Sequence, residues 1–437
     1  MLFWTPPFAS PDEPAHWDRA WALSEGQVVA EIEDGKVGAD LPRSLGRLIA
    51  IYDGGLAFQP GRRLVPGTLA RAAGLELEAA DRERVDFRNT AQLPFALYLP
   101  QAAACRLGRA LGARPLWIFH AARLINFLAA TALLGWAIAR TPRGRWLLAG
   151  IALSPMAAAL RASLSADALA LAVAAAFLAA VAALAESEAP LAGRPELFSL
   201  LLASVALGLS KPVYAPLLAA LLLIPGDRLP GRRRTWLALP LGLALAGLAA
   251  SLAIAARIGG RMRFDVAIDS RRQLALALQH PLDALGTLAS DLVVHAPRYV
   301  AQALGHKLGW LDAPLPRVAV VTLGLGLVLL AALEIGSGPR EPRARARLVA
   351  TLAAAMGGAL AIELAQWIET TPLGAPGVEG VQGRYFLPLL PLCLLIARPE
   401  PNRGTRWSRL RAATVAGIAA LSGIAAVLAL EGRYFRG

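Results

Sequence analysis

The sequence predicts an all-α polytopic membrane protein with about ten transmembrane helices. Three observations support this fold class. First, 56% of the 437 residues are hydrophobic, whereas an ordinary soluble domain contains roughly 45–50%. Second, the excess is mainly Ala and Leu in long runs with few charges, which is typical of helices that cross a membrane. Third, arginines gather in the short segments between these runs.

Ten apolar segments provide the predicted crossings. Hydropathy places them near residues 115–139, 146–162, 164–184, 197–210, 213–225, 236–256, 315–335, 348–368, 385–397 and 412–430. A straight helix needs about 20 residues to cross the bilayer, and the first, third, sixth, seventh and eighth segments reach that length. The segments within 197–225 and 385–397 are shorter and are therefore the weakest members of the set.

Four arginine clusters predict the orientation of these helices. They contain Arg140, Arg143 and Arg145; Arg232, Arg233 and Arg234; Arg340, Arg343, Arg345 and Arg347; and Arg398, Arg403, Arg406, Arg409 and Arg411. With ten crossings all four clusters fall on one side, which the positive-inside rule makes cytoplasmic. The loop 185–196 lies on the same side and is mildly acidic, which counts slightly against this topology. The net charge of +13 is then explained by topology, and we predict no nucleic-acid partner.

Three segments lie on the opposite, outer side: residues 1–114, which contain an acidic motif, residues 257–314, and the loop 369–384. The transmembrane helices lie between and after them, in residues 115–256 and 315–437. Amphipathic patterns such as "RRQLALALQHPLDALGTLASDLVVHAPRYVAQAL" predict helices that lie along the membrane surface in both long outer regions.

The stretch "FASPDEPAHWDRAW" near the start of the chain predicts the beginning of a helix. Asp12 is a suitable N-cap, Pro14 fits the first turn, and Glu13 suits the positive end of the helix dipole. Trp17 and Trp21 are spaced i, i+4, as expected for an interfacial helix. The same rigid helix start can hold a carboxylate that removes a proton from a hydroxyl group. Both interpretations remain open, and they are compatible.

Two cationic motifs lie on the predicted outer side. Lys211 in "LGLSKPVYAP" is either a lysine that extends its charge to the membrane surface or a point charge for a phosphate group. Arg384 in "GVEGVQGRYFLPLLPL" is either an interfacial Arg–Tyr anchor or a guanidinium fork that binds phosphate oxygens.

Two carboxylates lie within apolar runs. Asp167 in "RASLSADALAL" lies near the outer end of its run, six residues after Arg161. An ionisable group inside the membrane is a functional candidate, but an Arg–Asp pair that braces two helices explains the residues equally well. The same alternatives apply to Glu363.

The sequence contains no Walker loop, no GxSxG and no HExxH motif. The five histidines show no metal-ligand spacing. Cys105 and Cys393 lie far apart, which indicates neither a disulfide framework nor a metal knuckle.

Seven stretches occur in the order typical of one family. They are "TPPFASPDEPAHWDRAWALSEG", "LPRSL", "NTAQLPFALYLPQA", "ASLSADAL", "LSKPVYAPLL", "LGWLDAPLP" and "GVQGRYFLPLLPL". Together they resemble the domain-of-unknown-function 2142 (DUF2142) family of bacterial multi-pass membrane proteins, which looks like a branch of the GT-C glycosyltransferase superfamily. The family pattern has a complete transmembrane helix before "TPPF", whereas this sequence has only residues 1–4. We expect a late start codon; restoring that helix gives about eleven crossings.

The resemblance implies a specific activity. GT-C enzymes carry an acidic motif in the first outer loop, so the resemblance implies Asp12 as general base, with Glu13 supporting it. It also implies a sugar donor on a polyprenyl phosphate and inverting transfer to a hydroxyl of a glycan or lipid acceptor, on the outer face of the cytoplasmic membrane. The residues predicted to surround the substrate or bind its phosphate are His16, Asp167, Lys211, Tyr214, Gln382, Arg384 and Tyr385. Asp12 and Glu13 alone do not make a metal site, so we predict no metal cofactor.

Three other functions fit a multi-pass membrane protein of this kind. They are a transporter or flippase for lipid-linked glycans, a ligase or polymerase of surface polysaccharide, and a non-catalytic scaffold. A transporter would place ionisable residues at mid-membrane, often with inverted repeats, and the sequence shows few such charges and no clear repeat. The acidic pair early in the chain favours the transferase.

Overall fold

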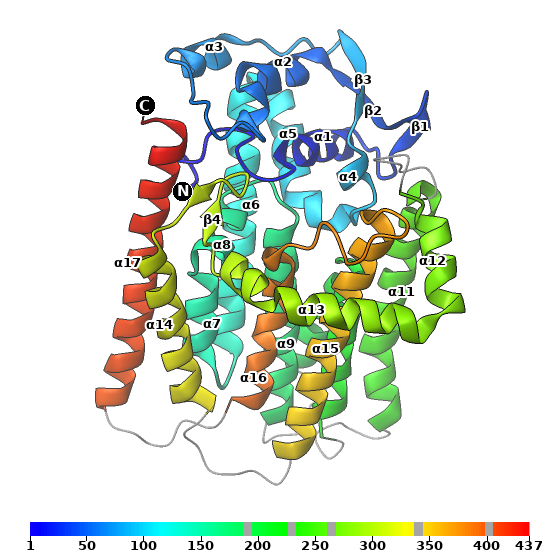
Figure 1. Cartoon of the computed structure of the whole chain (residues 1–437), viewed down its shortest axis with the longest axis vertical. Helices are drawn as coiled ribbons and strands as arrows, with labels where there is room; N and C mark the ends of the chain where they lie inside the picture. Colours follow the sequence, from blue (N-terminus) through cyan, green and yellow to red (C-terminus); the bar gives the residue numbers. More distant parts are fainter. Residues whose placement is uncertain (187–194, 226–232, 260–267, 336–343, 398–404, 437) are drawn as a thin grey trace.

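A computed structural model of the chain describes residues 1–186, 195–225, 233–259, 268–335, 344–397 and 405–436. Long helices run side by side along the long axis of the molecule, and a layer of short helices and strands covers one end of this bundle (Figure 1). We call the covered end the capped end and the opposite end the arginine end. The all-α membrane class is confirmed, because helices dominate and the strands among the described residues form only a small three-stranded sheet in the layer and a two-stranded hairpin later in the chain.

Residues 1–114 build the layer. Its helices and strands are α1 (Glu13–Ser24), β1 (Glu31–Glu33), β2 (Lys36–Pro42), α2 (Arg43–Ile51), η1 (Asp53–Leu56), α3 (Thr68–Gly74), β3 (Arg82–Asp86), α4 (Arg88–Ala91), η2 (Phe95–Tyr98) and α5 (Leu99–Ala110). The strands form an antiparallel sheet in the order β1-β2-β3, in which Glu31 pairs with Gly38 and Ala39 with Val85. The layer is thus a folded unit, and the chain enters the bundle only after it.

The tryptophans of α1 face the interior of the protein. Trp17 and Trp21 are both 0% exposed and contact each other edge to face at 5.4 Å. Trp17 also contacts Phe119 of the first long helix at 5.4 Å. The prediction that these two residues anchor an interfacial helix is therefore wrong. Because α1 packs between the rest of the layer and the bundle, its aromatic face is covered by protein instead of lipid.

Six helices in the described part of the chain are long and apolar enough to cross a membrane. They are α6 (Pro115–Arg140), α9 (Asp167–Glu186), α11 (Arg233–Gly259), α14 (Arg317–Ile335), α15 (Ala344–Glu369) and α17 (Thr405–Tyr434). Helix α9 is apolar on all sides and lies at the centre, with 89% of its most apolar window buried. The protein is a multi-pass membrane protein.

The remaining predicted crossings are shorter or broken. The segment near 146–162 divides into α7 (Arg145–Ala152) and α8 (Pro155–Arg161), because Pro155 cannot continue the hydrogen bonding of α7. The other short elements are α10 (Pro195–Gly208), the 3-10 helix η3 (Pro212–Leu223), the 3-10 helix η5 (Gly383–Leu392) and α16 (Cys393–Ile396). Internal prolines exclude regular α-helix in η3 and η5. A 3-10 helix rises about 2.0 Å per residue instead of 1.5 Å, so these segments reach further than their length suggests.

The second outer region contains two helices and a hairpin. Helix α12 spans Ser270–Gln279, and α13 spans Pro281–Ala303 and runs across the bundle below the layer (Figure 1). Strands β4 (Lys307–Leu308) and β5 (Ala313–Pro314) form the hairpin. The apolar residues exposed on α13 include Leu282, Val293, Val294 and Val300. This pattern matches the amphipathic helix that the sequence predicts.

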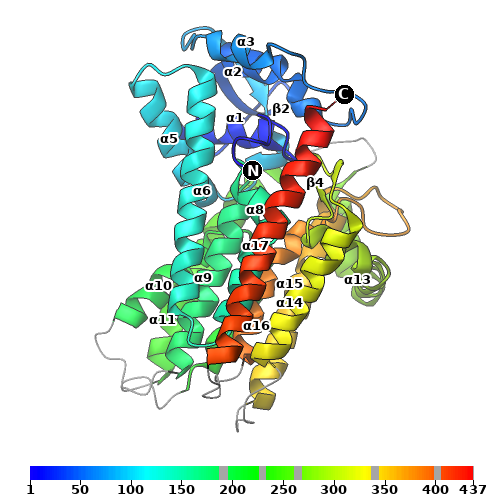
Figure 2. The same ribbon diagram turned by 90° about the vertical axis from the view of Figure 1, so that its left-hand side faces the viewer.

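Both chain ends lie near the capped end (Figure 2). The hydroxyl of Tyr434, at the end of α17, donates to the carbonyl oxygen of Ala9 at 3.3 Å. The neighbouring Arg433 donates from Nε to Asp312 at 2.6 Å, next to the β4–β5 hairpin. The last helix therefore fastens the first residues to the bundle.

The arginine end contains carboxylates that pair with the arginine clusters. Arg143 Nε lies 2.6 Å from Glu186, and Arg347 contacts the same carboxylate at 3.4 Å. Arg140 contacts Glu196 at 3.2 Å. The acidic loop that counted against the predicted topology thus supplies partners for arginines on the same side. Arg232, Arg340, Arg343, Arg398 and Arg403 lie outside the described residues.

Candidate active site at the capped end

Four charged side chains from distant parts of the chain meet where the layer contacts the bundle. Nη2 of Arg384 lies 3.3 Å from Asp12, and Nε of Arg384 lies 3.6 Å from Asp167. The ammonium group of Lys211 donates a hydrogen bond to the other oxygen of Asp167. We call these four residues the charge network. The structure thus brings together four of the residues predicted from the sequence.

Local structure explains how the cations of the network are placed. Lys211 precedes the first proline of η3, and Arg384 is the second residue of η5. Gly383 allows η5 to approach α13 closely, since a Cβ atom here would lie 2.0 Å from the carbonyl oxygen of Tyr299. The N–H of Gly383 also donates to Gln302 of α13 at 2.7 Å.

The side chain of Asp12 accepts hydrogen bonds from Asn89 and Arg384 and does not cap α1. It occupies the N-cap position, but it has a left-handed conformation with φ 61°, and its side chain makes no capping hydrogen bond. The prediction of a capping side chain is therefore wrong. Asn89 of α4 donates to Oδ1 of Asp12 at 2.9 Å, and Arg384 contacts Oδ2. The side chain remains 39% exposed, whereas that of Asp167 is 5% exposed.

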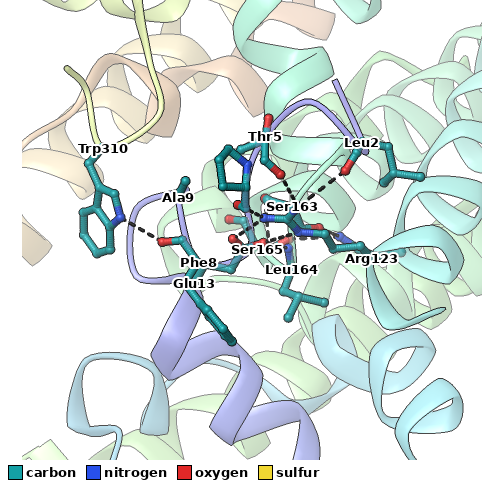
Figure 3. A network of polar contacts seen from close by, with 12 residues as sticks. Leu2, Thr5, Phe8, Ala9, Glu13, Arg123, Ser163, Leu164, Ser165 and Trp310 are labelled. Carbon is teal, nitrogen blue, oxygen red and sulfur yellow. Dashed lines mark hydrogen bonds and ion pairs between the residues drawn. The ribbon is translucent and has the colours of Figure 1, made fainter. Parts of the chain in front are cut away.

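Glu13 has a different environment from its neighbour. Its carboxylate forms a two-point ion pair with Arg123 of α6, with distances of 2.8 and 2.6 Å, and both side chains are 0% exposed (Figure 3). The N–H of Leu164, just before α9, donates to the same carboxylate at 3.0 Å. Arg123 also donates to the carbonyl oxygens of Thr5 and Pro6. Glu13 therefore fastens the start of α1 to the bundle and is not accessible to a substrate.

His16 lies behind the charge network. Its Nδ1 atom lies 2.7 Å from the hydroxyl of Tyr98, and its side chain is buried. Burial lowers the pKa of His16 to about 4, although the charges of Asp12 and Asp167 act in the opposite direction. The imidazole ring is therefore uncharged at neutral pH and forms one hydrogen bond with the phenol of Tyr98.

Aromatic residues connect the two cationic segments. The hydroxyl of Tyr214 in η3 donates to the carbonyl oxygen of Tyr385 in η5 at 3.0 Å. The ring of Tyr385 lies 5.4 Å from Nζ of Lys211 and 5.3 Å from Cζ of Arg384, within the range of cation–π interactions. Gln382, also predicted for the site, directly precedes η5, and its Oε1 has no hydrogen-bond partner among the described residues.

Arg161 and Asp167 do not form the alternative pair that their spacing allowed. Arg161 donates to the backbone carbonyls of Ala157 and Ala152, where it supports the bend between α7 and α8. Asp167 instead accepts from Lys211 and lies beside Arg384. The pairing partners of Asp167 therefore come from segments that follow it by 44 residues or more.

The sequence did not single out several residues of the site. Asn89 positions Asp12, and Gln92 donates to Glu369 of α15 at 2.6 Å. Tyr98 supports His16, and Arg123 pairs with Glu13. Three of these four residues lie in or directly next to "NTAQLPFALYLPQA", a stretch that contributes to the family resemblance, so the signal was present without an assigned role.

A small pocket, with room for about one or two water molecules and partly open to solvent, lies beside Arg384. Hydroxyl groups of Thr5, Ser10, Ser163 and Ser165 and the aliphatic side chains of Met156, Leu160, Leu308, Leu311 and Leu430 line its wall. Arg384 is 3% exposed, and its Nε and Nη1 atoms make no hydrogen bond to any described residue. Such a buried guanidinium beside hydroxyl groups is suited to an anionic group with an apolar attachment.

Within the described ranges, no three His, Cys, Asp or Glu side chains are grouped so that they could hold a metal ion. The carboxylates of the charge network are matched by guanidinium and ammonium groups instead.

Comparison with known proteins gives one match. No curated protein and no solved structure matches the chain. A family described as "Predicted membrane protein (DUF2142)" matches residues 1–393, which include every member of the charge network. The chain therefore belongs to the DUF2142 family of predicted membrane proteins.

Proposed function

We propose that this protein is a membrane glycosyltransferase. It transfers a sugar from a polyprenyl-phosphate donor to a hydroxyl group of a glycan or lipid acceptor, with inversion, at the outer face of the cytoplasmic membrane. The observation that carries the proposal is the charge network, in which the partly exposed carboxylate of Asp12 contacts the buried Arg384, and Asp167 contacts both Arg384 and Lys211. The resemblance to GT-C enzymes supplies the reaction class.

Asp12 is the proposed general base. Its carboxylate is exposed enough to meet an acceptor, and Asn89 and Arg384 hold it in one position. In the reaction Asp12 takes the proton of the acceptor hydroxyl as the hydroxyl oxygen forms a bond to the anomeric carbon. The bond between that carbon and the phosphate oxygen breaks, and its electron pair remains on the phosphate.

Arg384 and Lys211 are the proposed phosphate ligands. The leaving phosphate gains negative charge in the transition state, which cations positioned beforehand stabilise. Asp12 and Asp167 together balance the charge of both cations. Nε and Nη1 of Arg384 have no hydrogen-bond acceptor among the described residues, so they can still donate to a bound group. Phosphate oxygens fit this need, and the aliphatic residues that line the adjacent pocket match an isoprenoid carrier in their apolar character.

The distribution of charge supports the proposed orientation. The described arginines of the α6–α7 connection lie at the end opposite the layer. The positive-inside rule assigns that end to the cytoplasm. The capped end, with the charge network, then faces outward, where polyprenyl-linked sugars are used.

Transfer assays with purified protein test the proposal. Polyprenyl-phosphate sugars and candidate acceptors are incubated with wild type, Asp12→Asn and the control Asp34→Asn. Asp34 is a matched control because it is an exposed aspartate of the same layer, also in the left-handed conformation. We expect transfer by wild type and by the control, and its loss in Asp12→Asn. Full transfer by Asp12→Asn would refute the assignment of the base, and movement of intact lipid-linked sugar without transfer would favour a flippase.

A further inference from the structure

A buried carboxyl group lies outside the charge network, in helix α15. Glu363 is 0% exposed and lies six residues before Glu369, the end of α15, or about 9 Å along the helix axis. Among the described residues, neither Oε1 nor Oε2 of Glu363 has a hydrogen-bond partner. The group therefore lies within a predicted membrane span, enclosed by protein.

Other buried carboxylates of the bundle are compensated. Glu13 pairs with Arg123, and Asp167 accepts a hydrogen bond from Lys211. Glu334 accepts hydrogen bonds from two backbone N–H groups at the start of α7. Glu363 has no such compensation. Because an ionised carboxylate without a partner is very unfavourable in an apolar interior, the neutral acid is the favoured form.

The charged groups around Glu363 do not supply a counter-ion. The charges that act on it are those of Asp291 and Arg298 on α13, which have opposite signs, and neither forms an ion pair with it. Helix α15 also packs against η3, η5, α12 and α16. The titratable side chains on or next to these elements are Lys211, Tyr214, Arg384, Tyr385, Arg271, Arg272, His280 and Cys393. Lys211 and Arg384 are engaged with Asp167, so their charge is already balanced.

A row of polar groups leads from Glu363 to the surface of α13. Tyr299, which is close enough to Glu363 for electrostatic coupling when that acid ionises, donates to Asp291 at 2.8 Å. Nδ1 of His295 lies 3.1 Å from the same carboxylate oxygen, and the His295 side chain is 36% exposed. Asp291 itself is 2% exposed. The row therefore begins at an exposed imidazole and ends beside the buried acid.

We propose that Glu363 is a proton-binding site: a neutral carboxylic acid within the membrane-embedded bundle that exchanges its proton with the capped end along Tyr299, Asp291 and His295. Release of the proton breaks the O–H bond of the acid and leaves the electron pair on the carboxylate. The proton passes to the polar row and then to water at His295. This site is separate from the charge network, so its existence does not depend on the proposed transferase activity.

Infrared spectroscopy of the full-length protein in lipid nanodiscs tests the protonation state. A protonated carboxyl group absorbs at higher frequency than a carboxylate and shifts in D₂O. We expect such a band in wild type and in the control Glu379→Gln, which changes an exposed glutamate in the outer loop that follows α15. The part of the band that comes from Glu363 should be lost in Glu363→Gln, which keeps the shape and neutrality of the buried side chain, whereas the part that comes from the buried Asp18 of the layer should remain and be lost in Asp18→Asn.

Dicyclohexylcarbodiimide gives a second, chemical readout. This apolar reagent takes the proton of an acid onto nitrogen while the carboxyl oxygen adds to its central carbon. The adduct rearranges to a stable acylurea, so the peptide gains the mass of one reagent molecule. We expect modification of Glu363 and none of Glu13, which is equally buried but paired with Arg123.

The two readouts decide the proposal together. A Glu363-dependent band supports the proton site even if the reagent is excluded by packing. A band that is the same in wild type and in Glu363→Gln would overturn the proposal, because Glu363 would then be ionised. Equal modification of Glu13 and Glu363 would also overturn it, since both would then react through local opening of the protein. The exchange route is tested by raising the pH and timing the loss of the Glu363 band. A slower loss in Asp291→Asn than in wild type supports the route, and an unchanged rate in both Asp291→Asn and His295→Gln would refute it.

Discussion

Nη2 of Arg384 lies 3.3 Å from a carboxylate oxygen of Asp12, although 372 positions separate the two residues. The same guanidinium lies 3.6 Å from Asp167. One arginine thus holds an exposed carboxylate and a buried one on either side of it. Asp12 is open to an incoming hydroxyl group, whereas Asp167 is enclosed and serves to balance charge.

Neutralising Glu13 should destabilise the protein, whereas neutralising Asp12 should not. Glu13→Gln leaves Arg123 as a buried cation without its carboxylate, and breaking such a pair costs about 3–5 kcal/mol. Asp12→Asn keeps the left-handed conformation and can still bond to Asn89, so we expect thermal unfolding close to that of wild type. Thermal unfolding in detergent, followed by the fluorescence of the buried tryptophans, measures both.

The opposite order of stabilities would contradict this division of roles. If Asp12→Asn unfolds early and Glu13→Gln does not, Asp12 is the structural residue of the pair. The transfer assay then distinguishes a folding defect from a catalytic one, because only a base is expected to lower the rate by about 10²–10⁴-fold without loss of protein.

A double variant separates the two roles of Lys211. Lys211→Met leaves Asp167 buried beside a single cation, so we expect reduced stability and weaker donor binding. Adding Asp167→Asn removes the uncompensated charge and should restore much of the stability. Donor binding should not recover, since the cation for the phosphate is still missing.

Thermal unfolding and the Michaelis constant for the donor are measured for both single variants and the double variant. Recovery of stability and of donor affinity together would show that Lys211 only balances Asp167. Recovery of stability alone is the expected result.

His16 should make the layer sensitive to mild acid. Burial lowers the pKa of His16 in the folded protein to about 4, from an ordinary value of 6.5. The unfolded chain therefore binds a proton first, so stability is present above pH 6.5 and is lost as the pH falls towards 4. The loss is on the order of a few kcal/mol. Unfolding temperatures measured between pH 7.5 and 4.5 should fall less steeply in His16→Gln than in His280→Gln, which removes an exposed histidine. Parallel curves would contradict the prediction.

Asp18→Asn should stabilise the protein at neutral and higher pH. Burial raises the pKa of Asp18 to about 8, and the nearby charge of Glu83 adds to the effect. Below pH 3.8 the acid is protonated in both the folded and the unfolded chain. As the pH rises from there towards 8, the unfolded chain gains stability by ionising, so the folded state is progressively weakened. Asparagine has no such penalty. A gain in unfolding temperature that increases from pH 5 to pH 8 is expected, and a loss at every pH would contradict it.

The long helices were predictable because their apolar runs are continuous. The predicted segment 115–139 corresponds to α6, and 348–368 lies within α15. The division of 146–162 into two helices was missed because hydropathy averages over Pro155. The convergence of Lys211 and Arg384 on one site was also predictable, because both follow from motifs at the ends of apolar runs on the same predicted side.

The layer was less predictable, and the reason is physical. An aromatic face on a helix looks the same in sequence whether lipid or protein covers it, so the burial of Trp17 and Trp21 could not be foreseen. A single arginine within an apolar run, such as Arg123, does not reveal its partner. Asp167 selects Lys211 and Arg384 over the nearby Arg161 because the tertiary fold, and not spacing along the chain, decides which cations reach it.

The ion pair of Glu13 with Arg123 also has a consequence for biosynthesis. The ribosome makes the layer before α6, so Glu13 has no ion-pair partner until Arg123 is synthesised 110 residues later. Asp12 meets Arg384 only after a further 261 positions have been added, and at about 5–20 residues per second the whole interval from Asp12 to Arg384 takes roughly 20–75 s. A nascent chain that stops before η5 therefore carries the acidic motif without the guanidinium beside it. The charge network becomes complete only when the bundle is nearly complete, so an unfinished molecule in the membrane lacks it.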